Sequence, residues 1–320
     1  MIAATQRIGI VTEEGLERSL SAVAAEAVGE TEGIFGPESM MWRIDREACL
    51  FLGAGRALLL QLSHPWIATA VADHSRALAD PIGRFHRTFG IMFAMVFGTR
   101  DQAFAAARRL HRRHAAIRGV LPQTGGPFAP GSAYCANDAE ALFWVHSTLT
   151  ETSVLAHELL CPPLSPAERE RHYAESKLLA KLFGIPDAVL PPNWPSFLAY
   201  ASAMHRSTVL TVTPSARRIA HVVLAGAGSW LRSPGWYRAL TAGMLPERLR
   251  EGFGLSYGEA ERRSAERALA RIRRLYPLLP GRLRYVGPYQ EAAGRLAGRP
   301  DPDAGTRLVN RFWIGRPELG

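Results

Sequence analysis

Two histidines, His111 and His114, stand three residues apart in a segment whose spacing predicts a helix from residue 101 to residue 118. At about 100° per residue, His114 falls near the middle of the apolar face of this helix and His111 falls toward its edge. The same face carries Ala103, Ala107, Leu110 and Ile117. A neutral imidazole among aliphatic side chains either bonds to a backbone carbonyl or ligates a metal or haem iron. The helix alone leaves both interpretations open.

The preceding segment, residues 80 to 97, predicts a helix that is apolar on nearly every side. Arg84 and Thr88 stand four residues apart and therefore share one of its faces. A buried guanidinium needs an anionic partner. Asp73 or Asp80 would provide one within the chain, whereas haem propionates or a bound oxygen species would provide one from outside.

Other polar residues allow a metal site without a porphyrin. His146, Glu151 and His157 lie in a helix predicted from residue 138 to residue 160. Together with His111 and His114, they would supply the ligands of a carboxylate and histidine centre inside a helical bundle. This metalloprotein is the first alternative to a haem protein, and a non-catalytic haem or lipid carrier is the second.

Two motifs suggest chemistry that their surroundings do not support. Residues 254–258 match G-x-S-x-G, but no strand precedes Ser256, which we expect to cap the next helix with Glu259 as its partner. The glycine pairs at 53/55 and 226/228 lack the third glycine and the βαβ unit of a dinucleotide site. We expect the first pair to let helices pack closely. Neither a hydrolase nor a dinucleotide enzyme is predicted.

The elements that must position these residues are helical along almost the whole chain. Beyond those named, helices are predicted at 13–28, 37–46, 50–62, from 65, at 165–183, 194–206, 234–245, 256–276 and 289–296. The best strand candidate is 209–213. We therefore predict an all-α protein with one multi-helix domain at 36–298, an N-terminal helical extension at 1–35 and a C-terminal tail at 299–320.

Composition describes an ordinary globular chain of 320 residues, with 47% apolar and 21% charged residues. Of the 38 basic residues, only Lys177 and Lys181 are lysine, and the arginines are scattered, so the net charge of +9 does not indicate nucleic-acid binding. Cys49, Cys135 and Cys161 are far apart and form no metal-binding or c-type haem motif. No signal peptide or membrane-spanning stretch is evident, which predicts a cytoplasmic protein.

The residues in order resemble the rubber oxygenase (latex clearing protein)/MpaB-type oxygenase family. The resemblance covers roughly residues 40 to 298. It rests on the runs 58–65, 73–75, 80–84 with Thr88, 97–98 and 114–119, on Tyr134, Asp138 and 144–146, and on the late Leu-Pro pairs at 245–246 and 279–280.

The resemblance implies a globin-like core that binds a non-covalent haem b. It implies that His114 is the proximal ligand of the haem iron, that Arg84, Thr88 and His146 contact the cofactor, and that Arg84 and Thr88 also act in catalysis. Relatives use O2 to cleave carbon–carbon double bonds in isoprenoid chains, so the implied partners are O2 and an apolar, unsaturated substrate.

Two positions depart from the family pattern. Arg87 stands where the latex clearing branch has a lysine that can approach the iron, and a guanidinium is a poor ligand. The distal glutamate of that branch has no counterpart here, and Asp73 and His74 are the nearest ionisable residues that could transfer protons. The chain is thus predicted to be a haem b-dependent oxygenase whose distal residues differ from those of the latex clearing branch.

Overall fold

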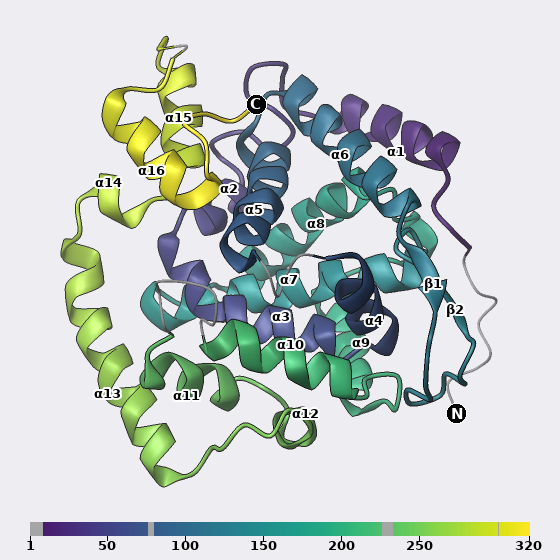
Figure 1. Cartoon of the computed structure of the whole chain (residues 1–320). Coiled ribbons are helices and arrows are strands. Elements are labelled where there is room, and N and C mark those ends of the chain that lie inside the picture. Colours follow the sequence, from purple (N-terminus) through teal and green to yellow (C-terminus); the bar gives the residue numbers. More distant parts are fainter. Residues whose placement is uncertain (1–8, 76–79, 226–232, 300) are drawn as a thin grey trace.

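The computed structural model describes residues 9–75, 80–225, 233–299 and 301–320, and it has the predicted all-α architecture (Figure 1). Its elements are α1 (Glu13–Glu26), α2 (Met40–Asp45), the 3-10 helix η1 (Ala48–Gly53), α3 (Ala54–Leu62), α4 (Pro65–His74), α5 (Pro81–Phe97), α6 (Arg100–Ala115), β1 (Arg118–Val120), β2 (Ala133–Cys135), α7 (Ala139–Leu160), α8 (Pro166–Leu182), η2 (Asp187–Val189), α9 (Trp194–Arg206), α10 (Pro214–Ala225), α11 (Gly235–Gly243), α12 (Glu247–Gly252), α13 (Glu259–Leu275), η3 (Tyr276–Leu278), α14 (Gly281–Arg284), α15 (Gly287–Leu296) and α16 (Ala304–Ile314).

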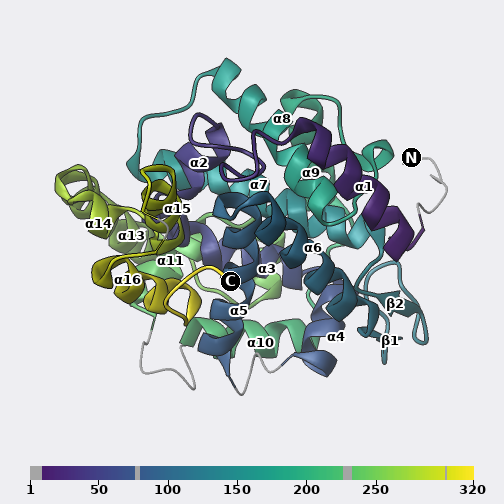
Figure 2. The same cartoon turned by 90° about the horizontal axis from the view of Figure 1, so that it is seen from above.

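The long helix α7 lies at the centre of the molecule, and both views show other helices around it (Figures 1 and 2). Buried residues follow one another along most of its length, so no single face of α7 is left for solvent. The largest hydrophobic cluster joins α1, α2, α5, α6 and α8, and a second cluster joins α3, α4, α10 and α12. Helices α5, α6 and α7, which carry most of the candidate residues, contribute to the first cluster. Helix α4, which carries Asp73 and His74, contributes to the second.

Helices α5 and α6 form an antiparallel hairpin with a tight connection at Gly98 and Thr99. The Thr99 hydroxyl accepts from the Gln102 amide, and the Gln102 side chain accepts from the Thr99 amide, which is a capping box. Helix α6 therefore begins at Arg100, one residue before the predicted start, because Thr99 and Gln102 satisfy its first amides. The hairpin closes at this end and opens toward Arg84 and His114.

A short antiparallel β-hairpin follows α6, where the sequence pattern predicted more helix. Gly119 pairs with Tyr134 in this ladder. A side chain at position 119 would lie within 2.5 Å of the Tyr134 hydroxyl, so only glycine leaves room for the ring. The hairpin places Tyr134 beside the end of α4.

Several predicted boundaries change. Residues 209–213 form a turn and an irregular segment instead of a strand. The cap of α13 is Gly258 with Glu261, whose carboxylate accepts from the Gly258 amide, and Ser256 lies outside the helix. The predicted close approach at Gly53 and Gly55 is confirmed, because a Cβ there would collide with Thr152 and Thr241. The glycine pair at 226 and 228 lies outside the described residues.

The C-terminal residues form α16, which packs on α15 and α5. Asn310 and Ile314 of this helix are buried, and so is Leu319 beyond it. Within the part of the chain that the structure describes, no helix is both long enough and apolar enough to cross a bilayer.

Candidate functional site

His114 lies in the last turn of α6, at the open end of the α5–α6 hairpin. Burial, together with the charges of Arg113 and His111, lowers the pKa of its imidazole to about 4. Its ring has no hydrogen-bond partner among the described residues. At neutral pH the ring is therefore uncharged, with a lone pair available to a ligand.

His111 is engaged elsewhere, although it is one turn away. Its Nε2 atom donates to the carbonyl of Val11 at 3.0 Å, and this bond ties α6 to the segment before α1. The two histidines thus differ as their positions on the helix predicted, since His111 was expected at the edge of the apolar face and His114 near its middle. The ring of His111 makes a structural hydrogen bond, and the ring of His114 remains available to a ligand.

Arg84 is partly buried one turn into α5, and among the described residues no carboxylate pairs with it. Burial lowers the pKa of its guanidinium, and the neighbouring cations Arg113 and Arg87 lower it further. Asp80 forms its ion pair with Arg87 at 3.2 Å and accepts from the Gly83 amide. Asp73 accepts from Tyr134. Neither internal partner expected for Arg84 is therefore realised.

No acidic residue outside the described ranges can fill this role, because residues 1–8, 76–79, 226–232 and 300 include no Asp or Glu. Arg113 lies close enough to perturb both Arg84 and His114, so the three side chains form one site, which we call the cationic end of the hairpin. A neutral imidazole beside unpaired guanidinium groups suits a ligand that carries both a metal and carboxylates. In the chemistry of their donor groups, these residues suit an iron porphyrin.

Thr88 shares the face of Arg84, four residues later on α5, and its side chain is exposed. Exposure leaves its hydroxyl free to contact a bound molecule at the mouth of the site. Arg87 lies on the neighbouring face and is occupied by Asp80. This ion pair and its fixed charge give Arg87 no free lone pair for a metal.

Asp73 and His74 form the exposed end of α4 and are both held by the β-hairpin. The Tyr134 hydroxyl donates to Asp73 Oδ2 at 2.9 Å, and His74 Nε2 donates to the Arg118 carbonyl at 3.1 Å. The Asp73 carboxylate and burial raise the pKa of the Tyr134 phenol above its ordinary value. The hairpin thus orients both residues that were predicted to move protons.

His146 lies on the central helix α7, with none of its interactions directed to His114. Its Nε2 atom is 3.3 Å from the Thr150 hydroxyl, and its ring stacks on Phe143. Burial lowers its pKa to about 3, and the nearby His172 adds to this effect. The metal-ligand set without porphyrin is dispersed, since Glu151 bonds to Arg56 at 2.9 Å and His111 to Val11.

An apolar cavity of about 120 Å³ lies between α5 and the elements α2, η1, α3, α7 and α8. Phe89, Met92 and Phe93 line it from α5, and Met92 is one turn beyond Thr88 on the same face. A cavity of about 150 Å³ with an apolar lining can hold benzene. The cavity therefore has room for a small gas molecule or a few carbon atoms of a longer ligand.

Two titratable side chains in this cavity escaped the sequence analysis. Burial and the charge of Glu175 raise the pKa of Asp45 to about 7, and no hydrogen bond to its carboxyl group is found in the described residues. His172 bonds to the Ser153 hydroxyl through Nε2, while its buried Nδ1 has no partner. The position of Asp45 at the end of a mostly apolar segment, residues 40–44, was the signal available in the sequence.

Comparison with known proteins places these residues within one family. The family described as ER-bound oxygenase mpaB/B'/rubber oxygenase, catalytic domain, matches residues 41–275, a range that contains the cationic end of the hairpin and the cavity. Neither a curated protein nor a solved structure matches the chain.

Proposed function

The chain belongs to the mpaB/rubber oxygenase family and is an enzyme, an oxidoreductase of oxygenase type; from this premise we propose that it is haem b-dependent and uses O2 on an apolar, unsaturated, isoprenoid-like substrate. We further propose that residues 36–298 form the haem domain around a globin-like core. His114, Arg84, Thr88, Asp73, His74 and His146 would have the roles predicted from the sequence. Arg113 and Asp45 would be additional residues of the site.

One observation carries the proposal: the neutral, unbonded imidazole of His114 lies beside guanidinium groups that lack an anion. His114 would hold the haem iron on its proximal side, and Arg84 and Arg113 would pair with the haem carboxylates. Bound haem supplies the redox chemistry that activates O2, which no amino-acid side chain provides. The low pKa of His114 keeps its lone pair free down to about pH 5.

The surrounding residues would bind and orient the substrate. The cavity along α5 offers aromatic and methionine side chains to an apolar chain that passes Thr88. Its mostly apolar lining disfavours water around a bound substrate. Arg84 and Thr88 would contact the cofactor edge or the oxygen species from the same face of α5.

Proton transfer has two candidate routes. Asp73 and His74 are exposed and held by the β-hairpin, so they can exchange protons with solvent. Asp45 is buried, and its carboxyl group is about half protonated near pH 7, which suits an acid that works inside the apolar cavity. A pH dependence that disappears in Asp45→Asn would select the second route.

The test is an absorption spectrum of protein expressed with added haem precursor, recorded before and after dithionite and O2. We expect a Soret band that is lost in His114→Ala and retained in His111→Ala, which is the matched control because it lies one turn away. The proposal is wrong if the wild-type protein binds no haem, or if the His111 variant alone loses it.

Two further variants test the separate contributions of Arg84 and His146 to haem binding. Arg84→Leu should weaken haem retention without changing the axial ligand, so its remaining spectrum should keep the wild-type band positions. The contribution of His146 to cofactor binding remains a prediction, and the spectrum of His146→Leu tests it. Haem bound without any O2 consumption in the presence of alkenes would favour the non-catalytic carrier instead.

A further inference from the structure

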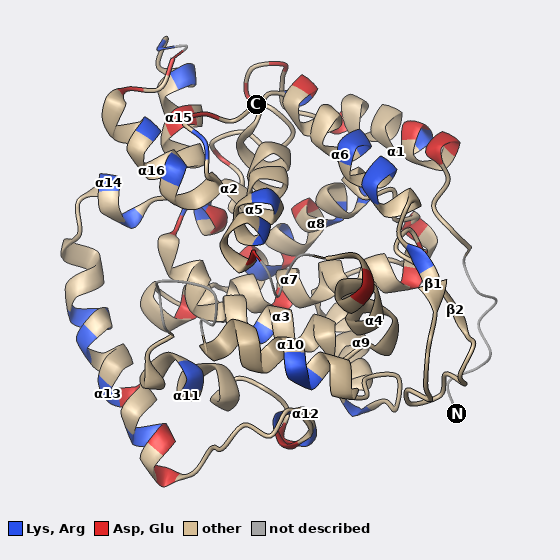
Figure 3. Cartoon of the chain, in the orientation of Figure 1, with Lys and Arg blue, Asp and Glu red and all other residues tan. Residues whose placement is uncertain are grey.

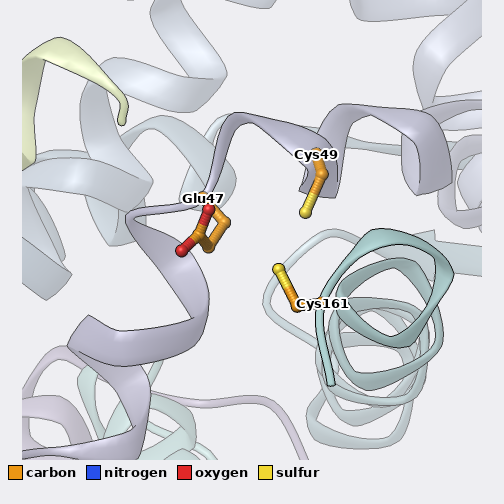
Figure 4. A group of neighbouring side chains, drawn as sticks. All are labelled: Glu47, Cys49 and Cys161. Atoms are coloured by element: carbon orange, nitrogen blue, oxygen red, sulfur yellow. The ribbon is translucent and has the colours of Figure 1, made fainter. Parts of the chain in front are cut away.

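A buried group of side chains far along the sequence from the cationic end brings two of the three cysteines together. Cys49 on η1 and Cys161 after α7 point their sulfur atoms toward one another, with Glu47 beside them (Figure 4). The two sulfurs and a Glu47 oxygen all lie within 4.8 Å of one another. The thiols are free, and the spacing of 112 positions in the sequence gave no sign of this contact.

The elements that carry the two cysteines are packed closely enough for a covalent link. A Cβ at Gly53 of η1 would lie 2.5 Å from Thr152 Cγ2 and 3.0 Å from Ala156 Cβ, so η1 rests directly on α7. A disulfide requires Cα atoms less than about 7 Å apart and Cβ vectors that converge. The glycine contact holds η1 on α7, and the two sulfurs converge beside this contact (Figure 4).

Glu47 is not available as a metal ligand in this arrangement. Its Oε2 atom accepts from the Tyr276 hydroxyl and from Arg284 Nε, both at 2.8 Å, and its Oε1 atom accepts from Arg284 Nη2 at 2.9 Å. A metal ion would have to displace this ion pair to gain a third ligand. Two sulfurs alone fall short of the four donors that a structural zinc site needs.

The surroundings make the two thiols unequal. The hydrogen bond from Cys49 lowers the pKa of Cys161, and the Arg284 guanidinium, 4.0 Å from its sulfur, lowers it further. The hydrogen bond to Cys161 and burial raise the pKa of Cys49. Cys161 is also the more exposed of the two, at 8% against 3%. It therefore meets an oxidant first and does so with more thiolate character.

We propose that Cys161 and Cys49 form a peroxide-oxidisable pair, with Cys161 attacking the oxidant and Cys49 resolving the product. The Cys161 sulfur takes one peroxide oxygen as the O–O bond breaks, and the other oxygen leaves as water. The Cys49 sulfur then attacks Cys161, forming the S–S bond and releasing the first oxygen as a second water. Two thiols lose two protons and two electrons, and one H2O2 becomes two H2O.

The disulfide would link η1 to the end of α7, and Leu50, Phe51 and Gly53 of η1 line the apolar cavity. Oxidation would thus restrict the wall of the cavity that the proposed oxygenase uses for its substrate. This consequence rests on the proposed function, but the thiol chemistry does not.

The test titrates free thiols in the purified protein before and after hydrogen peroxide, followed by unfolding and alkylation. We expect three thiols to fall to one, with Cys135 remaining, and a peptide cross-link between Cys49 and Cys161 that dithiothreitol reverses. Cys135→Ser is the matched control and should still form the cross-link. In Cys49→Ser, a sulfenic-acid trap should label Cys161, whereas Cys161→Ser should leave Cys49 unlabelled.

Three results would overturn the proposal: three thiols left after peroxide, a cross-link that involves Cys135, or one zinc ion released per chain when the thiols are blocked. None of these depends on haem or on a substrate. Failure of the thiol pair is therefore distinguishable from failure of the oxygenase assignment.

A different observation concerns the left edge of the molecule in Figure 1, formed by α13, η3, α14 and α16. Four leucines are exposed within nine positions there: Leu275, Leu278, Leu279 and Leu283, at 62%, 78%, 37% and 65%. Helix α14 contacts α16, which exposes Leu308 and Phe312. We call these six residues the leucine edge. Such a concentration of exposed apolar side chains marks an interaction surface.

The charge around the leucine edge is positive. From position 267 to position 290 the chain has six arginines and no acidic residue, whereas the glutamates of α13 lie toward its N-terminal end at 259, 261 and 266 (Figure 3). Arg282 and Arg284 are paired with Asp303 and Glu47. Arg267, Arg271 and Arg274 have no carboxylate partner among the described residues. Apolar side chains flanked by unpaired arginines suit the surface of an anionic bilayer.

We infer that the leucine edge docks on an anionic lipid surface. The test is co-sedimentation with vesicles of phosphatidylcholine alone or with phosphatidylglycerol. We expect binding only to the anionic vesicles, falling roughly tenfold or more in the double variant Leu278→Glu/Leu283→Glu. Leu198→Glu, at an exposed leucine of α9, is the control and should bind as the wild type. Arg271→Glu/Arg274→Glu should weaken the preference for anionic vesicles.

Equal binding of the wild type and the leucine variant would overturn this inference, and so would no binding to either vesicle. A self-association in solution that the same leucine variant abolishes would assign the edge to a second copy of the chain instead.

Discussion

Two partly buried arginines of this protein meet opposite surroundings. Arg284 meets Glu47, whose side chain is 2% exposed, through two hydrogen bonds, and the Tyr276 hydroxyl donates a third. Arg84 meets two other cations and no carboxylate. The first arrangement is complete within the chain, and the second is complete only with an anion from outside.

The contrast distinguishes a structural arginine, Arg284, from an arginine that is suited to bind a ligand, Arg84. A satisfied buried ion pair stabilises the assembled structure against loss of either partner. An unpaired guanidinium near other cations lowers the stability of the fold. A bound anion would offset this loss. The neutral imidazole of His114 at the same place indicates which kind of group that is, because it offers a metal its lone pair.

The largest expected effect comes from breaking the satisfied pair. Glu47→Gln should lower the free energy of unfolding by up to about 5 kcal/mol, because Arg284 loses its charge partner in a mostly buried place. Arg84→Leu, which removes the unpaired cation, should leave the stability of the haem-free protein unchanged or higher. Urea denaturation of both variants measures the contrast, and a comparable loss in both would erase the distinction.

A second uncompensated charge, Asp45, sharpens the comparison through pH. Its pKa is about 7 when folded and 3.8 as an ordinary aspartate, so the folded protein binds the extra proton between these values. Its contribution to stability is therefore full below about pH 4 and is lost as the pH rises through 7. The change amounts to at most about 4 kcal/mol. Asp45→Asn should flatten this part of the stability profile, which thermal unfolding across pH 4–8 would record.

The smallest effect concerns the anion that Arg84 lacks. Pyrophosphate should raise the melting temperature of the haem-free protein, by the equivalent of about 1.4 kcal/mol at ten times its dissociation constant. Arg84→Leu should reduce this gain, while Arg87→Leu, whose partner is Asp80, should not. Sodium chloride at equal ionic strength separates binding from screening. A gain that is the same in all three proteins would argue against an anion site at the cationic end.

Periodicity predicted the main helices of the site well, because their patterns are long and their interiors are apolar. The arginines 108, 109, 112 and 113 are exposed on α6, and Ala103 and Ala107 are buried, as the helical face required. The ends of helices were less predictable. Asp101 and Ser256 are good capping residues, yet Thr99 and Gly258 cap α6 and α13, since the turn before each helix decides which amides need a partner.

Hydrophobic periodicity could not predict the contacts between segments that are distant in the sequence. The β-hairpin that holds Asp73 and His74 replaces the predicted end of a helix, because Tyr134 packs over Gly119. Asp45 and His172 came together only when α2 and α8 packed around a cavity. Cys49 and Cys161 met because Gly53 lets η1 rest on α7.

By itself, the sequence determined that the chain is helical, that His114 faces the interior, and that Arg84 and Thr88 share a face, because local spacing alone sets these properties. The tertiary structure decided which of these groups are left without a partner. Whether a carboxylate reaches an arginine, or one sulfur another, depends on how helices pack, and packing joins residues whose separation along the chain carries no information about their distance.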